Sequence, residues 1–224
     1  MERLCSDSCD SSEVSERLGH ANQDVLSHMD APLSLFRGLP SAVKVWQDDG
    51  VIAFSSFYSV RSKFCCPPGA RGYYELVILE MNIVPQYGFV SVSFNRMQAH
   101  SDNGDGDDKD SWALDGTRRC KWHDGTAAYE CKWKVGNVVG LACDLEKMQM
   151  LISINGSVEA PNGCVFELAV DRVQHGLFAA FTGSSGKVRC NLGVTPFKYA
   201  PPSADFKAFV DLHQNHAELA TTIQ

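Results

Sequence analysis

Hydrophobic and polar positions alternate along residues 133–157, and this stretch predicts a β-hairpin. Side chains in 138–145 alternate with a period of two residues, which is typical of a strand with two different faces. A short polar connection follows, and a second alternating run covers 150–155. Asn155 and Gly156 then favour a turn, because both residues tolerate positive φ angles. Two antiparallel strands of this kind need a second layer to cover their apolar side chains.

Apolar runs of strand length occur along much of the remaining chain. The run over 73–81 has apolar residues on both faces, which is typical of a central strand covered on both sides. Glu75 interrupts this run, and a buried carboxylate needs partners. Residues 61–72, with Pro-Pro-Gly, and 94–110 are expected to be loops. Further strands or short strand pieces are expected at 43–46, 51–57, 87–94, 111–116, 121–123, 177–181 and 188–192.

Many short strands, frequent glycine turns and little helix predict an all-β fold, a two-layer antiparallel β-sandwich. Residues 1–31 are rich in Ser, Asp and Glu, and are expected to form a flexible acidic tail. The sandwich is expected to occupy residues 32–200. A C-terminal helix and tail are expected in 201–224.

The C-terminal helix is predicted from its apolar spacing. Phe206, Phe209, Val210 and His213 follow each other at i, i+3, i+4 and i+7, and Ser203 is a suitable N-cap. We therefore expect one amphipathic helix whose Phe face packs on the sandwich.

Composition narrows the classes of function. The 224 residues carry a formal net charge of −7, and nucleic-acid or anionic-membrane partners normally need a basic patch. No apolar run approaches the roughly 20 residues that span a bilayer, and the N-terminus lacks the apolar core of a secretory signal. We expect a cytoplasmic or nuclear monomer with no nucleic-acid or membrane partner.

The nine cysteines are odd in number and form no C-x-x-C pair. Cys143 and Cys190 fall at core-facing positions of strand patterns. Without a secretory signal, free thiols in a reducing compartment are the expected state.

The hairpin resembles part of the SPRY domain, also called B30.2, through its sequence WKVGNVVGLACDLEKMQMLISINGS. The positions that fit are Trp133, Gly136, Gly140, Asp144, Leu145, Asn155 and Gly156. Asn137 stands where the family usually has Asp. Upstream, RGYYELVILEM is similar to the family's Gly-x-Tyr-Tyr-Glu strand. Downstream, GLFAAFTGSSGKVRCNLGVTPF is similar to its closing strands, with Leu192 in place of the usual Phe.

The resemblance implies a sandwich of two curved sheets with concanavalin-like architecture and no chemistry of its own. It implies binding of a short segment of a partner protein by loops at one end of the sandwich. Rigid sheets would hold these loops, so that little entropy is lost on binding. The candidate loops are 61–72, 94–110 and 182–186. Their expected contact residues are Arg61, Lys63, Phe64, Phe94, Arg96, Met97, Ser184 and Ser185.

Ubiquitin-ligase elements flank the sandwich in many SPRY proteins, so an adaptor role in ubiquitin or signalling complexes is one expectation. The sequence has no RING-like array of Cys and His and no obvious C-terminal ligase-recruiting box. An effector role would then rest with the short tails or with a partner.

Metal binding is a weaker interpretation of two stretches. The carboxylates of Asp102–Asp110 would suit calcium, but Gly104 and Gly106 occupy ligand positions of the EF-hand register, so a solvated, flexible loop is favoured. A zinc site at Cys120, His123 and Cys131 lacks standard spacing and a fourth ligand. We expect neither metal nor cofactor.

An enzymatic function has little support. Cys120 lies near His123-Asp124, but no signature of a catalytic nucleophile surrounds them. The chain also has no P-loop and no dinucleotide fingerprint. We expect a binding protein rather than an enzyme.

The alternative hypothesis is a lectin-like module that binds carbohydrate, because fold does not determine function. Its site would be Asp102–Asp110 with Trp112 as the aromatic platform. Trp133 is expected in the core, whereas Trp122 fits either packing at the rim or contact with a partner.

Overall fold

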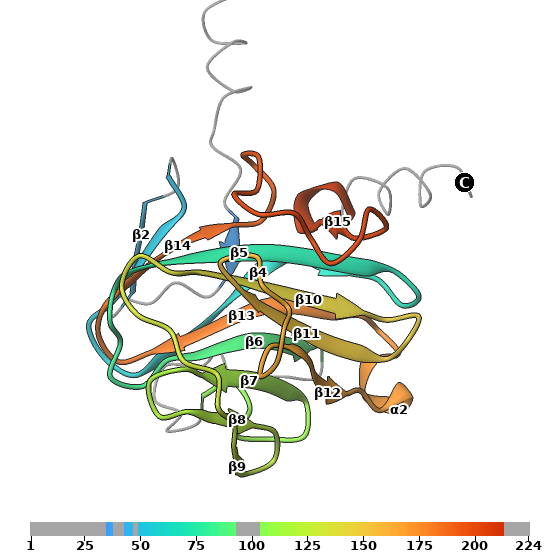
Figure 1. Cartoon of the computed structure of the whole chain (residues 1–224), viewed down its shortest axis with the longest axis horizontal. Helices are drawn as coiled ribbons and strands as arrows, with labels where there is room; N and C mark the ends of the chain where they lie inside the picture. The colour runs from blue at the N-terminus through green and yellow to red at the C-terminus, as the bar shows by residue number, and fades with distance from the viewer. Residues whose placement is uncertain (1–34, 38–42, 47–48, 93–103, 213–224) are drawn as a thin grey trace, which may run out of the picture. The chain divides into compact units, whose positions relative to one another are not determined.

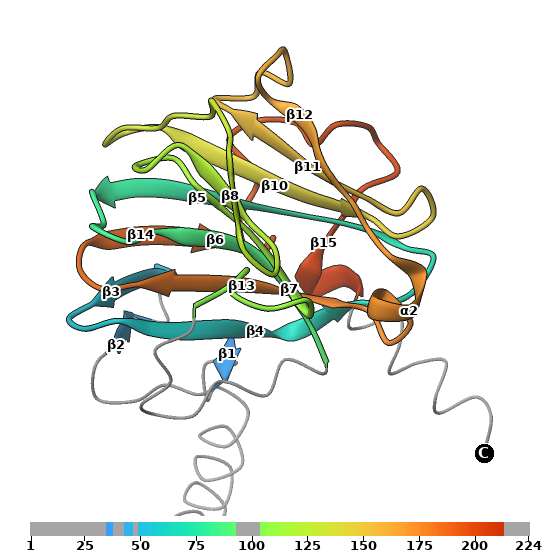
Figure 2. The same cartoon turned by 90° about the horizontal axis from the view of Figure 1, so that it is seen from below.

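The computed structural model describes residues 35–37, 43–46, 49–92 and 104–212. All of them belong to one compact unit, Ser34–Gln224. They form the two facing β-sheets that the alternating pattern predicted (Figures 1 and 2).

One sheet, called sheet I here, has seven strands in the order β1-β4-β13-β6-β7-β8-β9, all antiparallel. Its strands are β1 (Phe36–Arg37), β4 (Tyr58–Cys66), β13 (Leu177–Gly183), β6 (Gln86–Ser91), β7 (Ser111–Asp115), β8 (Cys120–Trp122) and β9 (Thr126–Ala128).

The other, sheet II, has eight strands, seven of them in the order β12-β11-β10-β5-β14-β3-β2. These are β12 (Gly163–Glu167), β11 (Gln149–Ile154), β10 (Val138–Asp144), β5 (Arg71–Glu80), β14 (Lys187–Asn191), β3 (Val51–Phe54) and β2 (Val43–Trp46). The eighth, β15 (Lys207–Ala208), pairs in parallel with β5. A single helical turn, α2 (Val170–Val173), precedes β13.

The predicted hairpin forms β10 and β11, next to the centre of sheet II. Leu141 lies opposite Ile152, and both side chains are buried in the core between the sheets. Asn155 and Gly156 take positive φ angles of 51° and 81°, as the turn prediction requires. Cys143 is likewise buried, and so is Cys190 on β14.

Aromatic rings link the two sheets. Tyr74 of β5 meets Phe181 of β13 edge-on, with ring centroids 5.6 Å apart, and its hydroxyl donates a 2.7 Å hydrogen bond to the Gly88 carbonyl of β6. Trp133 is buried and stacks on Tyr87 at 5.7 Å, so its expected core role is confirmed.

The predicted loop over 61–72 needs correction. β4 continues to Cys66, and only residues 67–70 connect it to β5. The Pro-Pro-Gly sequence belongs to this short turn, and the residues on either side of the turn are strand. In β4, Ser62, Phe64 and Cys66 are buried while the residues between them are half-buried, which is a strand pattern.

The C-terminal prediction is correct only in part. Residues 207–208 form β15 rather than helix, and helix begins at 209 and is described to 212. Phe209 does pack in the core, 5.8 Å from the Tyr74 ring. Phe206 packs with Tyr73 on the other side of sheet II. Phe206 and Phe209 are three residues apart, as on one face of a helix, but they pack on opposite sides of sheet II.

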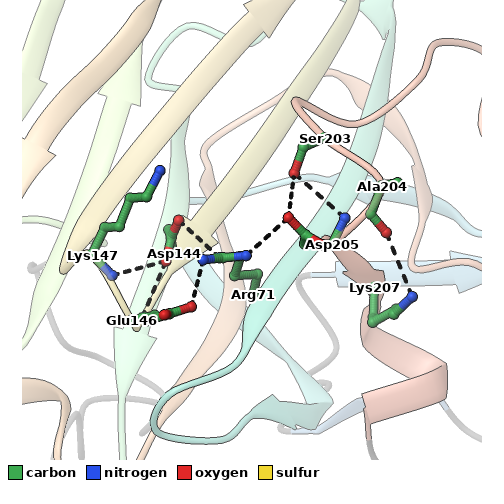
Figure 3. A network of polar contacts seen from close by, with 8 residues as sticks. All are labelled: Arg71, Asp144, Glu146, Lys147, Ser203, Ala204, Asp205 and Lys207. Atoms are coloured by element: carbon green, nitrogen blue, oxygen red, sulfur yellow. Dashed lines mark hydrogen bonds and ion pairs between the residues drawn. The ribbon is translucent and has the colours of Figure 1, made fainter.

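Arg71 fixes the C-terminal segment to sheet II. Figure 3 shows its guanidinium between carboxylates of different segments: Nε donates to Asp144 at 3.1 Å, and Nη1 lies 3.0 Å from Asp205. Nη2 binds Glu146 in the β10–β11 turn. The same Asp144 accepts hydrogen bonds from the Glu146 and Lys147 amides, so one side chain shapes the turn and anchors Arg71.

Candidate functional site

The side chain of Asn82 joins two connections at one end of the sandwich. Asn82 lies in the β5–β6 connection and is buried. Its Oδ1 accepts hydrogen bonds from the Ser184 and Ser185 amides of the β13–β14 connection, at 3.0 and 3.2 Å, and from the Val84 amide at 3.1 Å. The two connections are therefore held as one rigid unit.

Neighbouring backbone completes this end. The Phe54 amide donates to the Gly186 carbonyl at 3.1 Å, which brings in the β3–β4 connection. Thr117 Oγ1, in the β7–β8 turn, donates to the Asn82 carbonyl at 3.4 Å. We call this surface the Asn82 edge and define it by the side chains that it exposes in whole or in part, namely Ser55, Ser56, Ile83, Ser184 and Ser185.

Ile83 is the most exposed large apolar side chain in the described part of the chain, at 70%. It lies next to Asn82, which holds the backbone around it. An apolar side chain on a rigid turn, beside hydroxyl groups, suits recognition of an extended segment. Sequence reasoning missed both residues, although Asn within a turn between two strands was a usable signal.

The predicted contact residues fall into three groups. Ser184 and Ser185 lie on the Asn82 edge. Arg61 and Lys63 lie on β4, half-buried, and the Arg61 guanidinium carbon stacks 4.0 Å from the Phe178 ring centroid. Phe64 packs in the core at 4% exposure, so it serves the scaffold rather than a surface.

The third group is Phe94, Arg96 and Met97, which lies outside the described residues. So does most of the predicted 94–110 loop, which is described from Gly104 onward.

Residues 104–110 contradict the prediction of a solvated, flexible loop. The Asp105 amide donates to Thr182 Oγ1 at 2.9 Å, and Gln86 Nε2 donates to Asp107 Oδ1 at 2.9 Å. Gly106, at φ +89°, lies so close to Trp122 that a Cβ would be 2.3 Å from the Trp122 Cβ. Glycine and backbone-capping Asp residues let this acidic stretch pack on sheet I.

Asp105 is fully buried, at 0% exposure, and neither carboxyl oxygen has a hydrogen-bond partner within the described structure. Burial raises its pKa well above 3.8, the neighbouring Thr182 side chain lowers it in part, and the nearby carboxylates of Asp107 and Asp108 raise it further. The environment of this side chain therefore favours its protonated, neutral form over the ionised form.

The structure also shows the surroundings of Trp112 and Trp122. Trp112 is fully buried and stacks on His123 at 4.9 Å, so it offers no platform for a sugar. Trp122 is half-buried, with the Arg118 guanidinium carbon 4.5 Å from its ring centroid.

In the described ranges, no three His, Cys, Asp or Glu side chains gather as ligands for a metal. The cysteines described there are all free.

Comparison with known proteins supplies the family. The SPRY domain model matches residues 71–195, which is more than half of the chain. The chain belongs to the SPRY domain family. SPRY domains are protein-interaction modules.

One protein of similar sequence and one solved structure of similar fold can be compared with this SPRY domain. It is 32% identical over 146 residues to the E3 ubiquitin-protein ligase RKP of Arabidopsis thaliana, covering 64% of this chain and 11% of RKP. The chain thus matches only a small part of that relative. The crystal structure of the SPRY domain of human HERC1 is similar with a TM-score of 0.53 at 15% identity, over 70% of this chain and 96% of the HERC1 domain. That likeness supports the fold. Across the described residues, no helix is long and apolar enough to cross a membrane.

Proposed function

We propose that this SPRY domain binds a short, extended segment of a partner protein at the Asn82 edge, and that it catalyses no reaction. The observation that carries the proposal is the set of three amide hydrogen bonds to Asn82 Oδ1. They fix two connections before any ligand arrives, so ordering them costs no entropy on binding. The exposed Ile83 side chain provides the apolar anchor, and the hydroxyl groups of Ser184 and Ser185 provide polar contacts.

The outer face of β4 extends this site. Arg61 lies opposite Ala180 of β13, and Tyr58 of the same strand lies opposite Gly183, where the β13–β14 connection begins. Arg61 and Lys63 therefore lie further along β4, away from the end of the strand that reaches the Asn82 edge. Arg61 is ordered by its stacking on Phe178, and an ordered Arg is a common hot spot of protein interfaces. Phe94, Arg96 and Met97 remain proposed contacts.

The similarity to RKP supports a proposal about the kind of complex in which this domain acts. RKP is an E3 ubiquitin-protein ligase, and the match covers 11% of it. We propose that this domain acts as an adaptor that presents a partner to a ubiquitin-ligase complex.

Affinity capture from cell lysate tests the proposed function. The wild-type chain is compared with a variant that carries Ile83→Ser, Arg61→Ala and Gly-Gly in place of Ser184-Ser185, after circular dichroism has shown that the variant folds. Asp171→Ala and Lys147→Ala, two exposed substitutions away from this edge, form the control. We expect the edge variant to lose partners that wild type and control retain. Equal capture by all three proteins would refute the site.

A further inference from the structure

A second surface of the domain has the chemistry of a docking site, at the open edge of sheet I. β9 is the last strand of that sheet, and in the described structure no strand pairs with its outer side (Figure 1). Thr126, Ala127 and Ala128 are all exposed. The strand has only three residues, which limits pairing, but it carries none of the charges, prolines or bulges that protect many edges.

The register of the β8–β9 hairpin shows which backbone groups face the open side. The Tyr129 amide donates to the Arg119 carbonyl, and the His123 amide donates to the Gly125 carbonyl. Hydrogen-bonded and non-hydrogen-bonded pairs alternate in an antiparallel ladder. Thr126, opposite Trp122, and Ala128, opposite Cys120, therefore belong to non-hydrogen-bonded pairs. Their amide and carbonyl groups point away from β8, toward the open edge.

A groove of about 310 Å³ runs beside this edge. Its lining consists of Lys121, Phe166 and residues 123–127. Lys121 Nζ donates to the Val165 carbonyl of β12 at 2.9 Å and lies 5.0 Å from the Phe166 ring centroid. Two of its three ammonium hydrogens remain for a ligand. The groove therefore combines an aromatic wall with an oriented cation.

The local charge selects the kind of ligand. Residues 117–134 contain five basic and two acidic residues, within a chain whose net charge is −7. Arg118 pairs with the buried Asp115, and Arg119 lies 3.9 Å from Glu130. Lys121, Lys132 and Lys134 are the other basic residues of this stretch, and Asp124 of the β8–β9 turn lines the groove together with Lys121. Glu167 at the end of β12 is a further acid nearby. Lys132, which follows β9 in the chain, is also exposed.

We propose that β9 accepts an extended acidic segment of a protein, which adds to sheet I as a further strand. Its backbone would pair with Thr126 and Ala128, and its glutamate or aspartate side chains on the groove side would meet Lys121. Main-chain pairing supplies affinity in this mode of recognition, and alternate side chains supply specificity. The β8–β9 turn lies by Ser111, at the opposite end of β8 from the Asn82 edge, so this surface can be occupied independently.

Fluorescence anisotropy of the full chain with a labelled, acetylated and amidated (Val-Glu)₄ peptide tests the proposal. We expect saturable binding of this peptide and none of (Val-Lys)₄. Ala128→Pro removes the outward amide without removing a β8–β9 hydrogen bond, and should weaken binding about tenfold, as loss of one or two hydrogen bonds predicts. Ala128→Ser, which retains the amide, is the matched control, and Lys121→Met should weaken binding similarly.

N-methylation of alternate peptide residues provides a test that needs no protein variant. One of the two methylation registers should abolish binding. Absence of saturable binding up to about 1 mM, equal binding of both charge types, or equal affinity of wild type and Ala128→Pro would overturn the proposal. A wild-type dimer that Ala128→Pro abolishes would also overturn it, because the occupant of the edge would then be a second copy of this chain.

Discussion

The carboxylate of Glu75, in the middle of the central strand β5, accepts a 2.7 Å hydrogen bond from the backbone amide of Lys198. Its other oxygen accepts from the Tyr199 amide at 2.9 Å and the Tyr73 hydroxyl at 3.2 Å. Glu75 is 2% exposed. A charge that looked out of place in an apolar run thus organises the segment that follows β14.

Replacing Glu75 by Gln should destabilise the fold by about 2 kcal/mol, because the amide group then faces a backbone donor and leaves it unpaired. Urea unfolding measures this difference. Glu80→Gln on the same strand is the control, since the Glu80 side chain is 56% exposed and pairs with Lys187 at the surface. That control should change stability by less than about 0.5 kcal/mol. Equal effects of the two substitutions would contradict the structural role of Glu75.

Asn82→Ala removes the acceptor that holds the β13–β14 connection. Hydrogen–deuterium exchange of residues 184–186 should become faster, while exchange in β10 stays unchanged. Asn137→Ala is a suitable control, because Asn137 Oδ1 accepts only from the Lys134 amide in an exposed turn. Unchanged exchange at 184–186 in the Asn82 variant would show that the connection is rigid for another reason.

The pH dependence of stability should reveal the buried Asp105 carboxyl. Burial raises its pKa in the folded protein above 3.8, so its unfavourable contribution is absent below about pH 4 and grows as the pH rises toward the folded pKa. Asp105→Asn keeps the backbone hydrogen bond to Thr182 and cannot ionise. We expect the variant to gain stability relative to wild type as the pH rises above about 4. Urea unfolding across this range measures the gain, and a stability difference that is independent of pH would contradict it.

Much of the fold could be predicted from local patterns. The alternation in 138–145 and the Asn155-Gly156 turn determine β10 and its hairpin, since both depend only on neighbouring residues. The Pro-Pro-Gly turn hid the second half of β4, because three turn residues outweighed the alternation of Ser62, Phe64 and Cys66. Phe206 and Phe209 have helical spacing, yet pairing of 207–208 with β5 is a long-range contact that spacing cannot reveal.

The candidate site was harder to predict for the same reason. Ser184 and Ser185 were found because their block resembles the family. Asn82 was missed because its hydrogen bonds cross about a hundred residues of chain. The 104–110 stretch was mistaken for a solvated loop because its acidity suggests water. Only the folded chain shows that Thr182 and Gln86 bind that stretch.

Hydrogen–deuterium exchange of the full chain, with and without the partner segment recovered by affinity capture, tests the central claim most directly. Slower exchange is predicted at 81–85 and 184–186, with β9 and residues 203–207 unchanged. Protection confined to β9 or to the C-terminal segment, with 81–85 and 184–186 unaffected, would contradict the claim that the Asn82 edge binds the partner.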